Sequence, residues 1–300
     1  MKIGKVGVLL LAIALVLGVA GCREKTSGGK ADIAIGSKSF TEQVILAELV
    51  AQHIENSTDL KVERRFRLQG TFICHNALIG GQIDSYVEYT GTSFSAIFNK
   101  KTISDPVEVY RQVKEQYDRE FDIEVMQPLG FENTYAILVR AEDARKYNLK
   151  KVSQLAELDS QFQPGFGYEF IERLDGFPGL VEKYNLDFTK RPKTMAEGLM
   201  YRALAFNQVD VVAGNSTDGR IKKLDLFMLE DDLKYFPPYE AVPIFRKDTL
   251  AKYPELREAI AQLAGKISAT EMQEMNYQVD GEFRKLEEVV TEFLESKGLI

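Results

Sequence analysis

The chain has 300 residues, with 45 acidic and 38 basic side chains and a formal net charge of −7. This acidic balance disfavours nucleic acid as a partner, and the length favours two domains over one. The chain has two cysteines, Cys22 and Cys74, and Cys22 lies in an N-terminal targeting segment described next, so no intrachain disulfide is predicted.

The N-terminal segment has the composition of a secretory signal. Basic residues precede an apolar run from Val6 to Leu17, and small residues lead to Cys22. Because the run is shorter than the roughly 20 residues of a transmembrane helix, residues 1–21 are predicted to be a cleaved signal. Small residues directly before a cysteine resemble the bacterial lipobox, which implies a lipidated Cys22 followed by a flexible tether at 22–31. The alternative is an ordinary signal that happens to contain a cysteine.

The first strand is predicted at 32–36, because two isoleucines there share one face. Ser39 and Glu42 have capping-box spacing, and the apolar residues that follow have helical spacing as far as Ile54. The loop that carries Lys38 therefore leads into a helix N-terminus, where free amides and an ammonium could bind a small carboxylate. The alternative, a solvated lysine beside an ordinary helix cap, fits the periodicity equally well.

The stretch from Gly80 to Thr92 organises the first half of the chain. Its apolar and polar residues alternate, which predicts a short strand half buried on one face, ended by a turn at 90–92. Such a strand delivers Tyr89 and a polar loop to the carboxyl end of a sheet, which is where ligands bind in open α/β sheets.

Further elements follow from the spacing of apolar residues. The predicted elements are a strand at 62–68, a helix at 71–79, a helix at 105–121, a strand at 131–139 and C-terminal helices at 252–267 and 269–297. Tyr135, inside one of these strands, is either a core residue or a cleft residue. Two prolines make the segment 235–239 rigid, so Tyr239 would lose little entropy on contacting a ligand.

A short internal sequence repeat relates the two halves of the chain. Ala77-Leu78 and the later Gln82-Ile83-Asp84 recur as Ala203-Leu204 and Gln208-Val209-Asp210, at an offset of 126 residues. A second capping box at 194–197 would begin the repeated helix. At this offset Asn215 stands where Tyr89 stands in the first copy. The sequence therefore predicts two α/β lobes that each direct a polar loop at a shared cleft.

Catalytic and metal-binding patterns are weak. The two histidines, His53 and His75, lack ligand-like spacing to other metal-binding residues, and Cys74 reads as a buried apolar residue. No nucleophile elbow, phosphate loop or dinucleotide fingerprint is present. Glu88 with His75 is the one faint acid–base pair. Neither a metal nor a cofactor is expected.

Several segments together resemble one protein family. They are Gly36–Gln43, Tyr89–Thr92, Asn133–Ala136, Ser216–Ile221, Phe236–Tyr239 and Met272–Gly281. In order and spacing they are similar to the substrate-binding proteins of ABC importers for osmoprotectants such as glycine betaine, carnitine and choline. The resemblance implies an α/β, two-lobed periplasmic-binding-protein-like fold of type II with the ligand cleft between the lobes. Lobe 1 would span 32–136 plus 240–300, and lobe 2 would span 137–239.

The resemblance also implies a binding site. Tyr89, Tyr135 and Tyr239 match three positions of a tyrosine cage around a quaternary ammonium, whose fourth position holds Asn215 in place of tyrosine. Lys38 and Thr92 match positions that contact the carboxylate end of the ligand. A lysine there favours a betaine-type zwitterion such as glycine betaine, carnitine or an ergothioneine-like compound, with choline as a further candidate. Replacing Tyr89 or Tyr239 by alanine is then expected to weaken binding and to leave the melting temperature almost unchanged.

The resulting expectation is a monomeric, non-enzymatic solute-binding protein. It would be extracytoplasmic or periplasmic, held at the membrane only by lipidated Cys22, and would deliver its ligand to ABC permease subunits. The alternatives are an enzyme that uses the same cleft and a ligand sensor that acts on a signalling partner.

Overall fold

The computed structural model describes residues 31–173 and 175–300. The predicted signal at 1–21, Cys22 and the predicted tether up to residue 30 lie outside the described residues. Within those ranges, no helix combines the length and the apolar character that crossing a bilayer requires.

The first of two five-stranded sheets has the order β2-β1-β3-β10-β4. Its strands are β1 (Ile33–Gly36), β2 (Val62–Arg65), β3 (Ser85–Tyr89), β4 (Ile123–Val125) and β10 (Ala241–Arg246). β1 pairs in parallel with β2 and β3, whereas β10 runs antiparallel to β3 and β4. We call this sheet and its helices lobe 1.

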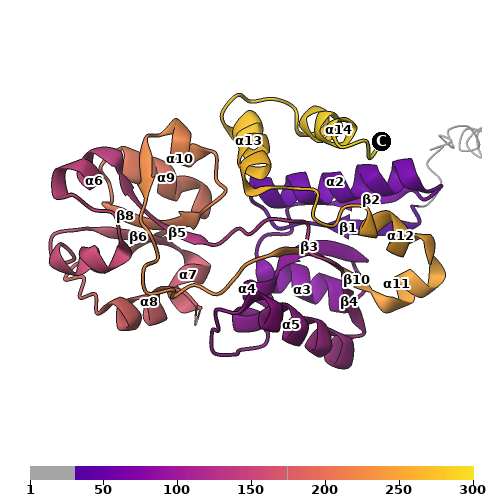
Figure 1. The fold of residues 1–300 in the computed structure, drawn as a ribbon, viewed down its shortest axis with the longest axis horizontal. Coiled ribbons are helices and arrows are strands. Elements are labelled where there is room, and N and C mark those ends of the chain that lie inside the picture. The colour runs from indigo at the N-terminus through magenta and orange to yellow at the C-terminus, as the bar shows by residue number, and fades with distance from the viewer. Residues whose placement is uncertain (1–30, 174) are drawn as a thin grey trace, which may run out of the picture. The chain divides into compact units, whose positions relative to one another are not determined.

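The second sheet repeats this arrangement with the order β7-β6-β8-β5-β9. Its strands are β5 (Tyr135–Arg140), β6 (Pro164–Gly167), β7 (Lys193–Met195), β8 (Val211–Asn215) and β9 (Leu226–Met228). β6 pairs in parallel with β7 and β8, and β5 runs antiparallel to β8 and β9. We call this sheet and its helices lobe 2. The chain passes between the lobes at 126–134 and again at 229–240, ahead of β5 and β10 (Figure 1).

Helices cover both faces of each sheet. Lobe 1 has α2 (Thr41–Ser57), α3 (Thr71–Ile79), α4 (Thr90–Thr92), η1 (Ser93–Ile97), α5 (Pro106–Phe121), α11 (Lys247–Lys252), α12 (Glu255–Ala261), α13 (Ala269–Asp280) and α14 (Leu286–Ser296). Lobe 2 has α6 (Ala141–Tyr147), η2 (Val152–Glu157), α7 (Tyr168–Glu172), α8 (Phe177–Tyr184), α9 (Glu197–Ala205) and α10 (Arg220–Lys223). The carboxyl ends of β3 and β8 each lead into the segments that line the site described below.

The predicted internal repeat is confirmed in the structure. α3 and α9 have the same length and an offset of 126 residues, as do β3 and β8. The turns between them repeat as well: the amides of Gln82 and Gln208 each donate to the carbonyl of the alanine five residues earlier, at 2.8 Å. In each lobe an aspartate at the start of this strand accepts a hydrogen bond from the neighbouring parallel strand region. Asp84 accepts from Ala34 N at 2.7 Å, and Asp210 accepts from Gln163 N at 2.8 Å.

These aspartates give a test of the repeat. Replacing Asp84 by alanine leaves a β1 amide without its acceptor, so we expect the free energy of unfolding to fall by about 1–3 kcal/mol. Urea denaturation measures the change. Asp59→Ala is a matched control, because Asp59 is exposed and accepts no hydrogen bond within the described part of the chain, and we expect it to change stability by less than about 0.5 kcal/mol. Equal effects of the two replacements would contradict a structural role for Asp84.

The predicted helix at 105–121 is confirmed. Asp105 caps it by accepting from the amides of Val107 and Glu108, and its stripe of Val109, Val113 and Tyr117 is fully buried.

The predicted strand around Tyr89 exists but is buried on both faces rather than on one. β3 lies between β1 and β10, with α2 packed on one face and with α3 and α5 on the other. Val87 therefore belongs to one core and Tyr86 to the other. A central strand between two helical layers has no solvent face, so alternation of residue types did not reveal its burial.

Other boundaries also differ from the sequence prediction. The segment 90–92 is helical rather than a simple turn, and the strand predicted at 131–139 begins only at Tyr135. The helix predicted at 252–267 ends earlier, with α12, whose last residue is Ala261. The helix predicted at 269–297 is interrupted between α13 and α14, where Phe283 adopts a left-handed φ of 59° that no helix can contain.

Candidate functional site

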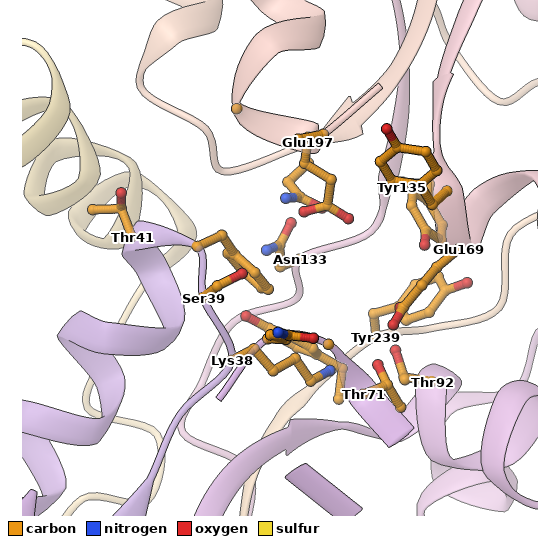
Figure 2. A pocket seen from close by; sticks show the side chains of 18 of the residues that line it. Lys38, Ser39, Thr41, Thr71, Thr92, Asn133, Tyr135, Glu169, Glu197 and Tyr239 are labelled. Carbon is orange, nitrogen blue, oxygen red and sulfur yellow. The ribbon is translucent and has the colours of Figure 1, made fainter. Parts of the chain in front are cut away.

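A cavity of about 540 Å³ is lined by residues of both lobes (Figure 2). All of the site residues predicted from the sequence within the described ranges line it: Lys38, Tyr89, Thr92, Tyr135, Asn215 and Tyr239. The structure thus brings together residues that are far apart in the chain. Whether they bind a ligand stays a prediction.

The aromatic wall is built from strand ends and from the second passage between the lobes. The rings of Tyr135 and Tyr239 meet edge to face, with centroids 5.8 Å apart and an interplanar angle of 87°. Tyr89, at the end of β3, is held by a hydrogen bond from its hydroxyl to Glu42 at 2.6 Å, and Tyr239 donates to Asp175 at 2.5 Å. Burial raises the pKa of all three phenols, so they stay neutral.

The burial of Tyr89 and Tyr239 changes one expectation. Their side chains are almost inaccessible and belong to the main hydrophobic core, and each hydroxyl has a buried carboxylate partner. Truncating either ring would leave a cavity and an unpaired carboxylate. The expectation that alanine at these positions would spare the melting temperature is therefore wrong on physical grounds.

Lys38 is less free than the sequence suggested. Its ammonium lies 2.5 Å from Glu88 Oε1, and both side chains are almost completely buried. Glu88 also accepts hydrogen bonds from the Tyr86 hydroxyl at 3.1 Å and from the Tyr89 amide at 2.8 Å. The ammonium lies 5.3 Å from the centroid of the Tyr89 ring. Lys38 therefore reaches the cavity as half of a buried ion pair, with hydrogen-bond donors left for a ligand but little net charge.

The predicted capping box at Ser39 and Glu42 is wrong. α2 begins at Thr41, its N-cap is Phe40, and no side chain caps it. Glu42 instead points into the protein, where burial raises its pKa and donors surround its carboxylate. The donors are Tyr89 and Asn133 on Oε1 and Thr217 and Asn276 on Oε2. One carboxylate thereby connects α2, β3, the first passage between the lobes, the loop after β8, and α13.

Asn215 ends β8 and is paired in register with Tyr135. The backbone amide of Asn215 donates a hydrogen bond to the Tyr201 hydroxyl at 2.8 Å, so it is already paired within lobe 2. The side-chain amide of Asn215 has no hydrogen-bond partner among the described residues, although it lines the cavity. At this position the cavity wall is a polar side chain without a hydrogen-bond partner, whereas the equivalent position in the first copy holds the ring of Tyr89.

Sequence reasoning missed the charged residues that lobe 2 contributes. Arg173 forms a bidentate pair with Asp175, with contacts of 2.8 and 2.6 Å, and its guanidinium lies 5.4 Å from the centroid of the Tyr135 ring. Glu169 and Glu197 also line the cavity. Glu197 was predicted to complete a second capping box, but α9 begins at Glu197 itself and has no side-chain cap.

The faint acid–base pair does not form at the cavity. His75 lies outside the cavity lining, where it packs edge-on against Phe121 at 4.9 Å, and burial lowers its pKa. Burial raises the pKa of the neighbouring Cys74 thiol to about 12. Glu88 is committed to Lys38. In the ranges that the structure describes, no group of three or more possible ligands could hold a metal ion.

Comparison with known proteins gives a consistent picture. A family model described as the substrate binding domain of ABC-type glycine betaine transport system matches residues 31–296. The chain is 37% identical over 293 residues to the Carnitine transport binding protein OpuCC of Listeria monocytogenes, covering 97% of this chain and 95% of that protein. It is 34% identical over 268 residues to the Ergothioneine transport permease/ergothioneine binding protein EgtU of Helicobacter pylori, covering 89% of this chain and 48% of that protein.

Solved structures share the architecture. A crystal structure described as a glycine betaine/carnitine/choline ABC transporter superimposes with a TM-score of 0.75 at 35% identity, covering 89% of this chain and 99% of that one. Lactococcal OpuAC in its closed-liganded conformation with glycine betaine has a TM-score of 0.60 at 14% identity, covering 89% and 96%, and at that identity shows a shared fold alone. These matches confirm the predicted two-lobed α/β fold.

Proposed function

Because the chain belongs to the family of substrate-binding domains of ABC-type glycine betaine transport systems, we propose that it captures a quaternary ammonium compound outside the cytoplasm and delivers it to an ABC permease. The ligand would occupy the cavity between the lobes, which would close around it by a hinge motion at the two passages. Within this proposal, lobe 1 spans 32–136 and 240–300 and lobe 2 spans 137–239, except that Tyr135 and Ala136 belong to strand β5 of the lobe 2 sheet.

The observation that carries the proposal is the aromatic wall. The faces of tyrosine rings are electronegative, and a methylated ammonium, which cannot donate an N–H hydrogen bond, is attracted to them within about 6 Å. Tyr89, Tyr135 and Tyr239 line the same cavity, and two of these rings meet at 5.8 Å. Such a wall suits a trimethylammonium group better than it suits a hydrated metal ion or a sugar.

The other end of the proposed ligand is a carboxylate. Lys38 and Arg173 each keep N–H donors beyond those used by their carboxylate partners, and the Thr92 hydroxyl lines the same cavity. These donors favour a betaine-type zwitterion such as glycine betaine, carnitine or an ergothioneine-like compound, with choline as a further candidate. The relatives named for carnitine and for ergothioneine support this class of ligand.

Anchoring completes the proposal. We place the protein at the outer side of the cell membrane, held by lipid on Cys22 after removal of residues 1–21. The support for this anchor is the lipobox-like sequence alone.

Calorimetric titration tests the ligand class. We expect glycine betaine, carnitine or ergothioneine to bind the purified protein, and 3,3-dimethylbutanoate to bind roughly tenfold more weakly than glycine betaine or worse. This compound has the shape and the carboxylate of glycine betaine but a carbon in place of the quaternary nitrogen. Equal affinity for the two would remove the cation–π basis of the proposal. Tight binding of choline with no binding of any betaine would overturn the preference for a zwitterion.

A further inference from the structure

The positive charge in the cavity wall is already balanced. Three cationic side chains line the cavity, and each has a carboxylate partner of its own at short distance: Lys38 with Glu88 at 2.5 Å, Arg173 with Asp175 at 2.6 Å and Arg220 with Asp218 at 2.5 Å. The cavity wall therefore offers the carboxylate of a zwitterion hydrogen-bond donors on cations that are already paired, and no excess of positive charge.

Two carboxylates of lobe 2 have no such partner. Glu169, on α7, and Glu197, at the start of α9, line the cavity, and neither side-chain carboxylate forms a hydrogen bond or an ion pair with any residue in the ranges 31–173 and 175–300. Asp280 also lines the cavity but accepts a hydrogen bond from the Thr41 hydroxyl at 2.7 Å. The unpaired carboxylates that line the cavity are thus on its lobe 2 side.

The two glutamates differ in what they face. Glu169 lies against the backbone at the start of α3 in lobe 1, since a Cβ on Gly70 would come within 2.0 Å of its Oε1. The N-terminus of α3 carries partial positive charge, which offers Glu169 a favourable environment across the cleft. Glu197 is the first residue of its own helix, α9, and Figure 2 shows its carboxylate pointing into the cavity on the side opposite Lys38 and Thr71.

Glu197 is half-buried. Burial, together with the nearby charge of Glu169, raises the pKa of its carboxyl. No donor of the described residues reaches this carboxylate, so a ligand that brings a hydrogen-bond donor to it would offset the part of its hydration that burial removes. The Asn215 side chain, which lines the same cavity, has no hydrogen-bond partner among the described residues either. A trimethylammonium group cannot satisfy either residue by hydrogen bonding, because it has no N–H.

We propose that Glu197 determines specificity by accepting a hydrogen bond from a hydroxyl or ring N–H that the ligand carries in addition to its trimethylammonium and carboxylate groups. The cleft then prefers a betaine with such a donor over glycine betaine, which has none. This inference rests on the proposed function and narrows it to one chemical subclass. Glu169 serves a different purpose, as a contact between the lobes.

Matched ligand pairs test the proposal. Carnitine and γ-butyrobetaine differ only in one hydroxyl, and ergothioneine can be compared with its analogue methylated on both ring nitrogens, which lacks both ring N–H donors. For at least one pair we expect the wild-type protein to bind the donor-bearing member about tenfold or more tightly, as for a hydrogen bond to a charged group. In Glu197→Gln, the affinity ratio of that pair should fall severalfold, through loss of affinity for the donor-bearing member alone.

Glu169→Gln is the matched control, since it removes the same charge from the same cavity. We expect it to weaken both members of a pair equally and to leave their ratio unchanged. Thermal melting checks that each variant is folded, and Glu197→Asp, which withdraws the carboxylate by one methylene, replaces Glu197→Gln if that variant unfolds.

The outcomes distinguish failure of the proposed function from failure of the specificity role of Glu197. If no trimethylammonium compound binds the wild-type protein, the proposed function fails and this inference fails with it. If betaines bind but neither pair is discriminated, or if Glu197→Gln weakens both members of a pair equally, the specificity role of Glu197 is overturned and the proposed function stands.

Discussion

Replacing Lys38 by methionine is expected to lower the free energy of unfolding by about 3–5 kcal/mol, because the change leaves the Glu88 carboxylate buried without a counter-charge. Glu88 is completely inaccessible to solvent, and its remaining donors are the Tyr86 hydroxyl and the Tyr89 amide. Neither donor supplies the full positive charge that the ammonium provides at 2.5 Å. Urea or guanidinium denaturation of the ligand-free protein measures the loss.

A second replacement separates the charge from the packing. In the double variant Lys38→Met with Glu88→Leu, neither charge of this pair remains, and we expect most of the lost stability to return, as happens when a buried ion pair is replaced by apolar residues. The exposed pair of Arg111 and Glu115 on α5 is the control, where Arg111→Ala should cost less than about 1 kcal/mol. If Lys38→Met costs no more than Arg111→Ala, the pair is not the buried contact described above.

The elements predicted best were those fixed by local signals. Helix α5 has its own N-cap at Asp105 and an apolar stripe at helical spacing, so short windows of sequence contain all that determines it. The repeat was recognisable because the turn geometry at Asp84 and Asp210 demands the same residue types in both lobes. Tertiary structure reinforced these signals and did not compete with them.

Both predicted capping boxes were wrong for one physical reason. Glu42 and Glu197 stand at the spacing at which a glutamate would bond back to the start of a helix, but each is used elsewhere. Glu42 accepts donors from both lobes, and Glu197 lines the cavity. The side-chain positions of these glutamates are determined by tertiary contacts, which a window of a few residues does not contain.

The lining of the site was predictable only in part. Tyr89 and Asn215 end equivalent strands, so the repeat together with the family resemblance located them. The segment that carries Glu169, Arg173 and Asp175 has neither the periodicity of a long helix nor a recognised motif. Its residues acquire a role through partners in other parts of the chain, such as Tyr239, which donates to Asp175. Partners that are distant in the chain are identified only from the three-dimensional structure.

Among the three tyrosines, Tyr135 offers the cleanest test of the aromatic wall. Tyr89 and Tyr239 are buried and donate hydrogen bonds to carboxylates, so truncating either ring would destabilise the fold as well as alter the site. Tyr135 is half-buried, and its hydroxyl has no hydrogen-bond partner among the described residues. Its ring nevertheless lines the cavity and meets that of Tyr239 at 5.8 Å.

Replacing Tyr135 by alanine is therefore expected to weaken betaine binding by roughly 3- to 30-fold, which corresponds to the loss of one cation–π contact. Tyr135→Phe keeps the ring face and should bind within about twofold of the wild type, because the quadrupole of the ring, and not its hydroxyl, attracts the ammonium. Tyr168→Ala, at an exposed position on the rim of the same cavity, controls for a general change of the cavity. Calorimetry gives all the affinities. If Tyr135→Phe loses as much affinity as Tyr135→Ala, the hydroxyl and not the ring face recognises the ligand, and the cation–π account of this wall is wrong.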